Sequence, residues 1–215
     1  MLRKTASRGK VPGNARGPFN VRPLVHSSKR PVVVHLGNVG WGSGPEVLAE
    51  KTRRYAKRFP GVQFIGIDKS SRYLGEMPDN WRQLVSSFGE GLKKLDNNSV
   101  SAISSELALG EFGPRGRYWD EHRQYRYRLT KRSFEAMVKY TADALKVAYR
   151  KLKRGGKLYV AVVDGEPLRV TKEALARSQF NPEKIKMRYL LEQEYKRTSG
   201  TRKGCAAKLQ IVAEK

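Results

Sequence analysis

Short apolar runs of strand length recur along the chain from residue 32 onwards, and segments with helical spacing separate them. Uninterrupted apolar runs are typical of strands that are buried on both faces, as in a parallel sheet covered by helices. Strands that alternate with helices in this way predict an α/β fold with a mostly parallel sheet. The predicted strands are residues 32–34, 63–67, 83–86, 100–104, 157–163, 185–195 and 207–213.

Helix signals fill the intervals between these runs. Pro45 stands at the first position of a helix predicted over 46–59, where its missing N–H leaves no bond unmade. A longer helix is predicted over 134–152, with Thr130 or Ser133 as its cap. Arg154-Gly155-Gly156 predicts a left-handed turn that ends this helix. Shorter helices are expected around Leu92 and Leu95 and over 171–178.

The glycine-rich segment after the first strand is the strongest sign of a ligand site. The stretch VVVHLGNVGWGSG passes from β-branched residues into Gly37, Gly40, Gly42 and Gly44. Glycines let the backbone approach a ligand where a Cβ would collide. About twenty residues on, the second strand delivers Asp68, where nucleotide-binding α/β folds place a carboxylate against ribose hydroxyls. A glycine-rich turn without a cofactor is the alternative.

The spacing of the glycines favours one cofactor over another. A dinucleotide site needs a further small residue where this chain has Pro45, so a plain NAD site fits poorly. The segment resembles motif I of the class I S-adenosylmethionine (SAM) methyltransferases instead. FPGVQFIGID, RLT before a long helix and LKRGGKLYVAVVD resemble landmarks of the tRNA (guanine-N7)-methyltransferase type.

This resemblance covers the chain from Val32 to the C-terminus. It implies a three-layer Rossmann-like sheet, mostly parallel with an antiparallel last strand, and SAM as the cofactor. Phe88 would stack on adenine or belong to the core. The implied cofactor-binding residues are Gly37, Asn38, Gly40, Trp41, Gly42, Gly44, Asp68, Phe88 and Ser104.

The segment after the fourth strand is where such an enzyme would hold the atom to be methylated. Glu106 is the best candidate for a catalytic residue there, because it could contact the substrate base or the cofactor. An ordinary polar loop residue is the alternative. A ring nitrogen needs no general base, and Cys205 lacks the context of a nucleophile. Ser104, Ser105 and Glu111 complete the polar residues of this segment.

The charge balance points to a polyanionic partner. The chain of 215 residues has 44 Lys plus Arg against 20 Asp plus Glu, a formal net charge of +24. Nucleic acid is favoured over a membrane surface, because the sequence shows neither a basic amphipathic helix nor a long apolar run. The single cysteine suits a reducing compartment, and the three distant histidines predict no metal site.

Three basic regions are expected to bind RNA. Residues 1–31 form an acid-free arm that could lie along phosphates, although an organellar transit peptide has a similar composition. The domain over 32–215 carries a basic insertion with interleaved aromatics at 111–132, and a basic hairpin loop lies near its end. The predicted RNA-binding residues are Arg115, Arg117, Trp119, Arg123, Tyr125, Arg126, Arg128, Lys196, Arg197, Arg202 and Lys203.

Two functional hypotheses follow from these features. The first is a SAM-dependent methyltransferase of tRNA or rRNA that works in the cytoplasm, or in an organelle if the arm is a transit peptide. The second is a non-catalytic RNA-binding or ribosome-binding protein on a degenerate methyltransferase scaffold. His35 favours the second, because methyltransferases usually have an acid at the end of the first strand. A protein-substrate methyltransferase and a NAD enzyme are the remaining alternatives.

Overall fold

The computed structural model describes the domain that follows the basic arm. It covers residues 30–37, 45–69, 74–106, 108–109, 112–113, 116–117, 130–190 and 209–215. Within the first helix, the side chains of residues 45–49 and 51 lie outside this description. Residues 1–29 of the arm and most of the predicted 111–132 insertion are also outside it.

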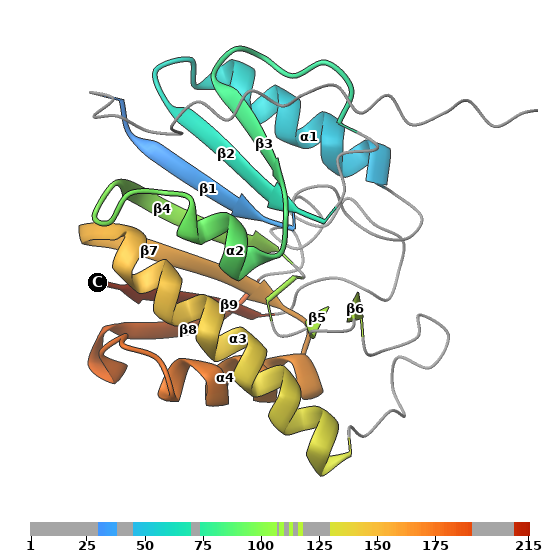
Figure 1. Ribbon diagram of the computed structural model, residues 1–215, viewed down its shortest axis with the longest axis vertical. Coiled ribbons are helices and arrows are strands. Elements are labelled where there is room, and N and C mark those ends of the chain that lie inside the picture. The colour runs from blue at the N-terminus through green and yellow to red at the C-terminus, as the bar shows by residue number, and fades with distance from the viewer. Residues whose placement is uncertain are drawn as a thin grey trace, which may run out of the picture.

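A seven-stranded sheet in the order β3-β2-β1-β4-β7-β9-β8 forms the centre of the domain (Figure 1). The strands from β3 to β7 are parallel, and β9 runs antiparallel to both of its neighbours. The predicted α/β fold with an antiparallel last strand is therefore confirmed. The strands are β1 (Val32–Leu36), β2 (Gln63–Asp68), β3 (Trp81–Val85), β4 (Val100–Glu106), β7 (Leu152–Val162), β8 (Ile185–Tyr189) and β9 (Leu209–Glu214).

Helices cover the two faces of the sheet unequally. The helices α2, α3 and α4 pack beside one another on one face, as Figure 1 shows. On the other face α1 covers β1, β2 and β3 through Ala56, which packs with Phe64 and Trp81. The helices are α1 (Pro45–Arg58), α2 (Phe88–Lys93), α3 (Lys131–Lys151) and α4 (Glu166–Ala176), with a 3-10 turn at Pro182–Lys184.

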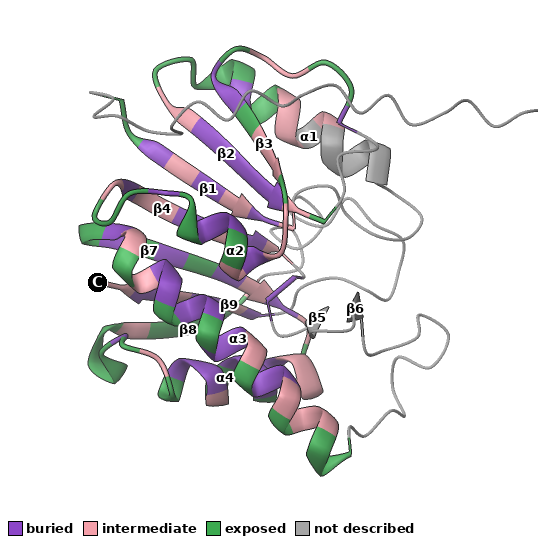
Figure 2. Cartoon of the chain, viewed as in Figure 1, coloured by how far each residue is buried: buried purple, intermediate pink, exposed green. Residues whose placement is uncertain are grey.

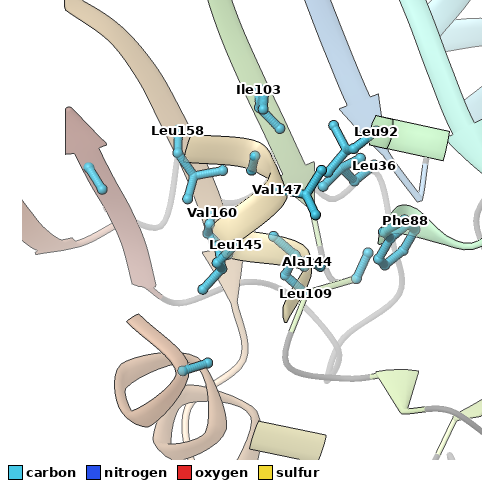
Figure 3. Packing of buried hydrophobic residues seen from close by; sticks show 14 of the residues in the cluster. Leu36, Phe88, Leu92, Ile103, Leu109, Ala144, Leu145, Val147, Leu158 and Val160 are labelled. Atoms are coloured by element: carbon cyan, nitrogen blue, oxygen red, sulfur yellow. The ribbon is translucent and has the colours of Figure 1, made fainter. Parts of the chain in front are cut away.

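The main core lies between the sheet and the α2, α3 and α4 layer. Figure 3 shows Leu36, Ile103 and Leu158 from three strands packed against Leu145 and Val147 of α3. Burial alternates along β7 and β9, so each strand turns one row of side chains into this core (Figure 2). The opposite row of β7 includes the exposed residues Lys157 and Tyr159.

The boundary between α3 and β7 corrects one prediction. Arg154-Gly155-Gly156 does not end the helix; α3 ends at Lys151, and Leu152 is already extended. Leu152 pairs with Val100 of β4 and is fully buried, so the strand begins directly after the helix. The left-handed glycine, Gly155 with φ +73°, lies inside an irregularity of β7.

Other boundaries differ from prediction because tertiary contacts set them. The third strand starts at Trp81, two residues before its predicted start, where Trp81 packs on Phe64. Just before it, the buried Asn80 side chain donates at 3.0 Å to the carbonyls of Ala56, Phe59 and Val62. Further shifts include an earlier α4, a β8 that ends at 189, and a fourth strand that continues to 106.

The predicted 111–132 insertion begins with a small antiparallel pair of strands. They are β5 (Phe112–Gly113) and β6 (Gly116–Arg117), and β5 lies against α3. Its end is the cap of α3, where the Thr130 hydroxyl accepts a hydrogen bond from Ser133 N at 3.2 Å. The choice between the two predicted caps is therefore settled in favour of Thr130.

Candidate functional site

The carboxyl ends of β2, β1 and β4 bring three predicted site residues into one row. Leu36 pairs with Ile67 on one side and with Ser105 on the other. The next residue along each strand is Asp68, Gly37 or Glu106, so these three occupy the same level of adjacent strands. Strands lie about 4.8 Å apart, which separates the Asp68 and Glu106 backbones by roughly 10 Å. Open α/β sheets bind ligands at this edge.

Gly37 is fixed by its neighbours as well as by its conformation. Its φ is +73°, and its N–H donates to Ile67 O at 2.9 Å. A Cβ at this position would lie 2.4 Å from Ala108 Cβ and 3.7 Å from the Phe88 ring. Close packing on Ala108 therefore requires a glycine here, independently of any ligand. The remaining predicted loop residues, Asn38, Gly40, Trp41, Gly42 and Gly44, lie outside the described residues.

Asp68 ends β2 with a half-buried side chain. Its carbonyl accepts a hydrogen bond from Ser86 N at 2.8 Å, which ties β2 to the segment after β3. A carboxylate held at a strand end beside a glycine is suited to the hydroxyls of a ribose. The position of Asp68 thus fits the predicted ribose contact, which stays a prediction.

Phe88 lies in the core at the start of α2. Its side chain is 7% exposed and lies near Leu36 and Leu92 (Figure 3). Burial raises the pKa of the Tyr140 phenol, which also hydrogen-bonds the backbone of Phe88. This packing is what the core alternative predicted, and stacking on adenine remains untested.

The segment after β4 folds back onto the core. Ser105 is buried, and its Oγ accepts a hydrogen bond from Leu109 N at 2.9 Å. Ala108 and Leu109 are buried beside it. Ser105 is one of the polar residues predicted at the site, but its hydroxyl closes this turn. Glu106 remains at the strand end, half-exposed, as the predicted catalytic residue.

His35 belongs to an aromatic cluster beneath α1. Its ring stacks on Phe64 and Trp81 at centroid distances of 5.8 and 5.7 Å and meets Tyr55 edge-on at 6.2 Å. Its Nδ1 lies 2.5 Å from the Oγ of Ser104, its register partner on β4. The predicted cofactor contact of Ser104 remains untested, and the structure shows this hydroxyl bonded to His35.

The alternation of side chains along β1 is a sequence signal for this cluster. His35 has the same strand parity as Val33, whose side chain packs beside Phe64 on the α1 face. Alternation along the strand therefore turns His35 away from the face that holds Val34 and Leu36. The partner of His35 on β4, Ser104, depends on the strand register, which the sequence does not show.

Of the predicted RNA-binding residues, Arg117 alone lies among the described residues. Arg117 lies in β6, and only its backbone is described. The other ten predicted RNA contacts lie outside the described residues. Within the described part of the chain, no three His, Cys, Asp or Glu residues gather as a metal site. The helices described there are also too short or too polar to cross a bilayer.

Comparison with known proteins rests on structure. No family model matches the chain, and no curated protein sequence matches it. A SAM dependent methyltransferase from Archaeoglobus fulgidus superposes with a TM-score of 0.51 at 12% identity, over 87% of each chain. Geranyl diphosphate C-methyltransferase from Streptomyces coelicolor A3(2), solved with S-adenosyl-L-homocysteine, gives 0.52 at 14% identity over 86% of this chain and 70% of that one.

The chain has the fold of SAM-dependent methyltransferases. The same fold also includes spermidine synthase from Thermotoga maritima, with a TM-score of 0.51 at 12% identity over 86% of this chain and 54% of that one. The fold alone therefore does not identify the reaction, and the residues at the carboxyl edge are the basis for a proposal.

Proposed function

We propose that this chain is a SAM-dependent methyltransferase that acts on structured RNA, tRNA or rRNA. The observation that carries the proposal is the row of Asp68, Gly37 and Glu106 at the carboxyl edge of a methyltransferase fold. In this row Asp68 would accept hydrogen bonds from a ribose, and Gly37 would leave room for the loop that follows it.

Of the predicted cofactor-binding residues, Gly37 and Asp68 lie at the carboxyl edge in positions that fit the proposed cofactor. When bound, SAM supplies an electrophilic methyl group on a sulfonium. The glycine loop after Gly37 would hold the methionine part, and Asp68 the ribose. The Ser104 hydroxyl is already hydrogen-bonded to His35, and Phe88 is packed in the core. We therefore expect these two residues to support the site from beneath rather than to make its main cofactor contacts.

Glu106 is the residue that we propose to orient the substrate base. It lies one strand away from Gly37, on the side of the sheet where the chain continues into the basic insertion. Orientation can supply much of the barrier reduction in a methyl transfer, with effective molarities of about 10⁵ to 10⁸ M. A ring nitrogen such as guanine N7 has a free lone pair, so Glu106 would need only to position the base.

The charge of the chain supports RNA as the substrate. A formal net charge of +24 favours a polyanion, and the insertion adds aromatic side chains that stack on unpaired bases. The tRNA (guanine-N7) type is the nearest candidate by motif. Action in the cytoplasm or an organelle, and association with the ribosome, belong to the same proposal.

A second candidate is a non-catalytic RNA-binding protein with this fold. It is favoured by His35, which stacks in the aromatic cluster where methyltransferases usually carry an acid. It is also favoured by the turn after β4, where Ser105 bonds to Leu109 instead of lining a site.

Calorimetry with SAM separates these two candidates. The enzyme should bind SAM and transfer a labelled methyl group from it to tRNA or rRNA. A chain that binds RNA but neither SAM nor its product supports the second candidate. A chain that binds SAM yet labels only small molecules or protein contradicts the proposed RNA substrate.

A further inference from the structure

The amino edge of the sheet, opposite the candidate site, is assembled from three segments. These are the turn between α2 and β4, the junction between α3 and β7, and the end of β9, and Figure 1 shows them together near the C-terminus. Asn98 N donates to Arg150 O at 3.0 Å. Lys215 exchanges backbone hydrogen bonds of 3.1 Å with Gly155 and Gly156.

Two lysines of this edge are bound to the protein itself. Lys151 Nζ donates to Leu95 O and, at 2.9 Å, to Asn97 Oδ1. Lys215 Nζ donates to Asn98 Oδ1 and Leu152 O, both at 2.7 Å. Burial lowers the pKa of Lys151, and the charge of Arg150 lowers it further. These ammonium groups join the segments and are already occupied.

An irregularity in β7 carries further cations outward. The strand advances from Leu152 to Lys157 while β4 advances only from Val100 to Ala102, so the residues between are extruded as a bulge. Gly156 packs against Val100 O, and Gly155 at φ +73° faces open space. Lys153 and Arg154 are exposed on this bulge, which we call the β7 bulge.

The exposed cations around the β7 bulge have no acidic partner among the described residues. They are Lys94, Arg150, Lys153 and Arg154. Of the neighbouring acids, Glu90 and Glu214 pair with Lys93 and Lys157, and the charge of Asp96 acts on Lys151. Cations at a helix C-terminus interact favourably with the helix dipole, which explains why Lys94 and Arg150 stand at the ends of α2 and α3. It does not account for Lys153 and Arg154, because that effect falls off within the last turn.

The outer surface of α3 and α4 shows how this protein treats cations elsewhere. Lys139 and Lys146 both pair with Asp143, at 2.7 and 3.9 Å. Arg177 pairs with Glu135 and Glu173, each at 2.9 Å. These three cations pair with carboxylates, whereas no salt bridge among the described residues joins Lys94, Arg150, Lys153 or Arg154 to an acid. The amino edge therefore carries four exposed cations that no described salt bridge neutralises.

We propose that the amino edge, through Lys153 and Arg154 with Lys94 and Arg150, binds the phosphate backbone of the RNA substrate. This inference rests on the proposed RNA methyltransferase function. The seven residues of β4 separate the two edges by roughly 23 Å at about 3.3 Å per residue. The substrate must then be a folded RNA large enough to reach both edges, and a short single strand at the carboxyl edge would not touch the bulge.

The test uses the full chain and two charge-matched double variants. Lys153→Gln with Arg154→Gln removes two charges from the bulge, and Lys139→Gln with Lys146→Gln removes two exposed charges from α3 as the control. Affinity for a folded tRNA and for an eight-nucleotide single strand is measured over a salt series. Thermal melting and SAM calorimetry on each variant check that the fold and cofactor site are intact.

The bulge variant should lose salt dependence on folded RNA, with the log-log slope smaller by about 1.4 to 1.8 for two phosphate contacts. Its affinity for the short strand, and the control's affinity for both, should match the parent. Lys94→Gln should reduce the slope by about half as much. Because Lys94 lies outside the bulge, this variant tests the same edge even if the double variant disturbs the bulge.

The outcomes separate the two proposals. If the bulge variant and the control behave alike on folded RNA while the parent binds it, the amino-edge proposal is wrong and the proposed function stands. If the parent binds no RNA, both are wrong. Loss of binding to anionic phospholipid vesicles, with RNA affinity unchanged, would assign the edge to a membrane surface instead.

Discussion

The two ends of the central sheet differ in charge and in how tightly their backbone is packed. At the carboxyl end two carboxylates, Asp68 and Glu106, flank Gly37, which packs against Ala108. At the amino end, exposed cations without a salt bridge among the described residues surround the β7 bulge, where Gly155 has open space around it. A parallel sheet directs its ligand loops to the carboxyl end. We expect the carboxyl end to bind the cofactor and the substrate base, and the amino end to bind RNA phosphates.

The largest expected effect comes from two glycines that share the same φ of +73°, one at each end. Gly155→Ala should destabilise the fold by roughly 1 to 2 kcal/mol, the cost of a left-handed alanine. Gly37→Ala carries the same strain plus overpacking against Ala108 at 2.4 Å, which adds about 1 to 3 kcal/mol. Urea unfolding of both variants measures the difference.

Equal destabilisation by the two alanines would show that the carboxyl edge yields as freely as the bulge. In that case the packing of Gly37 on Ala108 does not hold this edge in place. SAM affinity of the same variants, measured without urea, then shows whether the glycine loop still binds the cofactor.

Two aspartates provide the next test, one at each end. Asp68→Ala should weaken SAM binding by roughly 1.5 to 3 kcal/mol, the worth of hydrogen bonds to a charged group, with little change in stability. Asp96→Ala, an exposed residue in the turn before β4, should leave SAM affinity unchanged. Calorimetry on both variants checks the assignment, and parent-like SAM binding by the Asp68 variant would refute it.

The smallest expected effect separates stacking from charge. Trp119→Ala and Tyr125→Ala, outside the described residues, should each weaken binding of looped or single-stranded RNA by roughly 1 to 3 kcal/mol. Duplex affinity should barely change, because a duplex offers no unstacked bases. Arg126→Gln with Arg128→Gln should instead weaken both RNAs, as the bulge variant should weaken any folded RNA that reaches it.

Melting temperatures decide how that last comparison is interpreted. If the aromatic side chains are core residues of an ordered insertion, both variants melt earlier and lose affinity equally for looped and duplex RNA. Such a result would leave the amino edge as the remaining candidate for RNA recognition.

Elements with a strong local signal were predicted within a few residues. β1 and β2 contain short apolar runs and β4 is more mixed, and all three lie in the sheet as predicted. Pro45 begins α1 and Thr130 caps α3, because both roles depend on the residue and its immediate neighbours. The order of these elements also predicted Asp68 at the end of β2.

Boundaries set by distant residues were not predictable in this way. A Gly-Gly pair after a helix usually marks its end, yet Leu152 leaves α3 early because Val100 and the core accept it. Trp81 begins β3 because Asn80 is held by three carbonyls from residues 56 to 62. These hydrogen bonds join segments that are far apart in sequence.

The sequence by itself determined the α/β architecture, the strand ends at which a ligand is expected, and the excess of positive charge. Periodicity and glycine spacing are local properties, and composition does not depend on the fold. Only the tertiary structure decided the row of Asp68, Gly37 and Glu106, the hydrogen bond between His35 and Ser104, and the exposure of Lys153 and Arg154. The physical reason is register: a shift of one residue between strands turns every side chain to the opposite face, and pairing across the whole sheet fixes it.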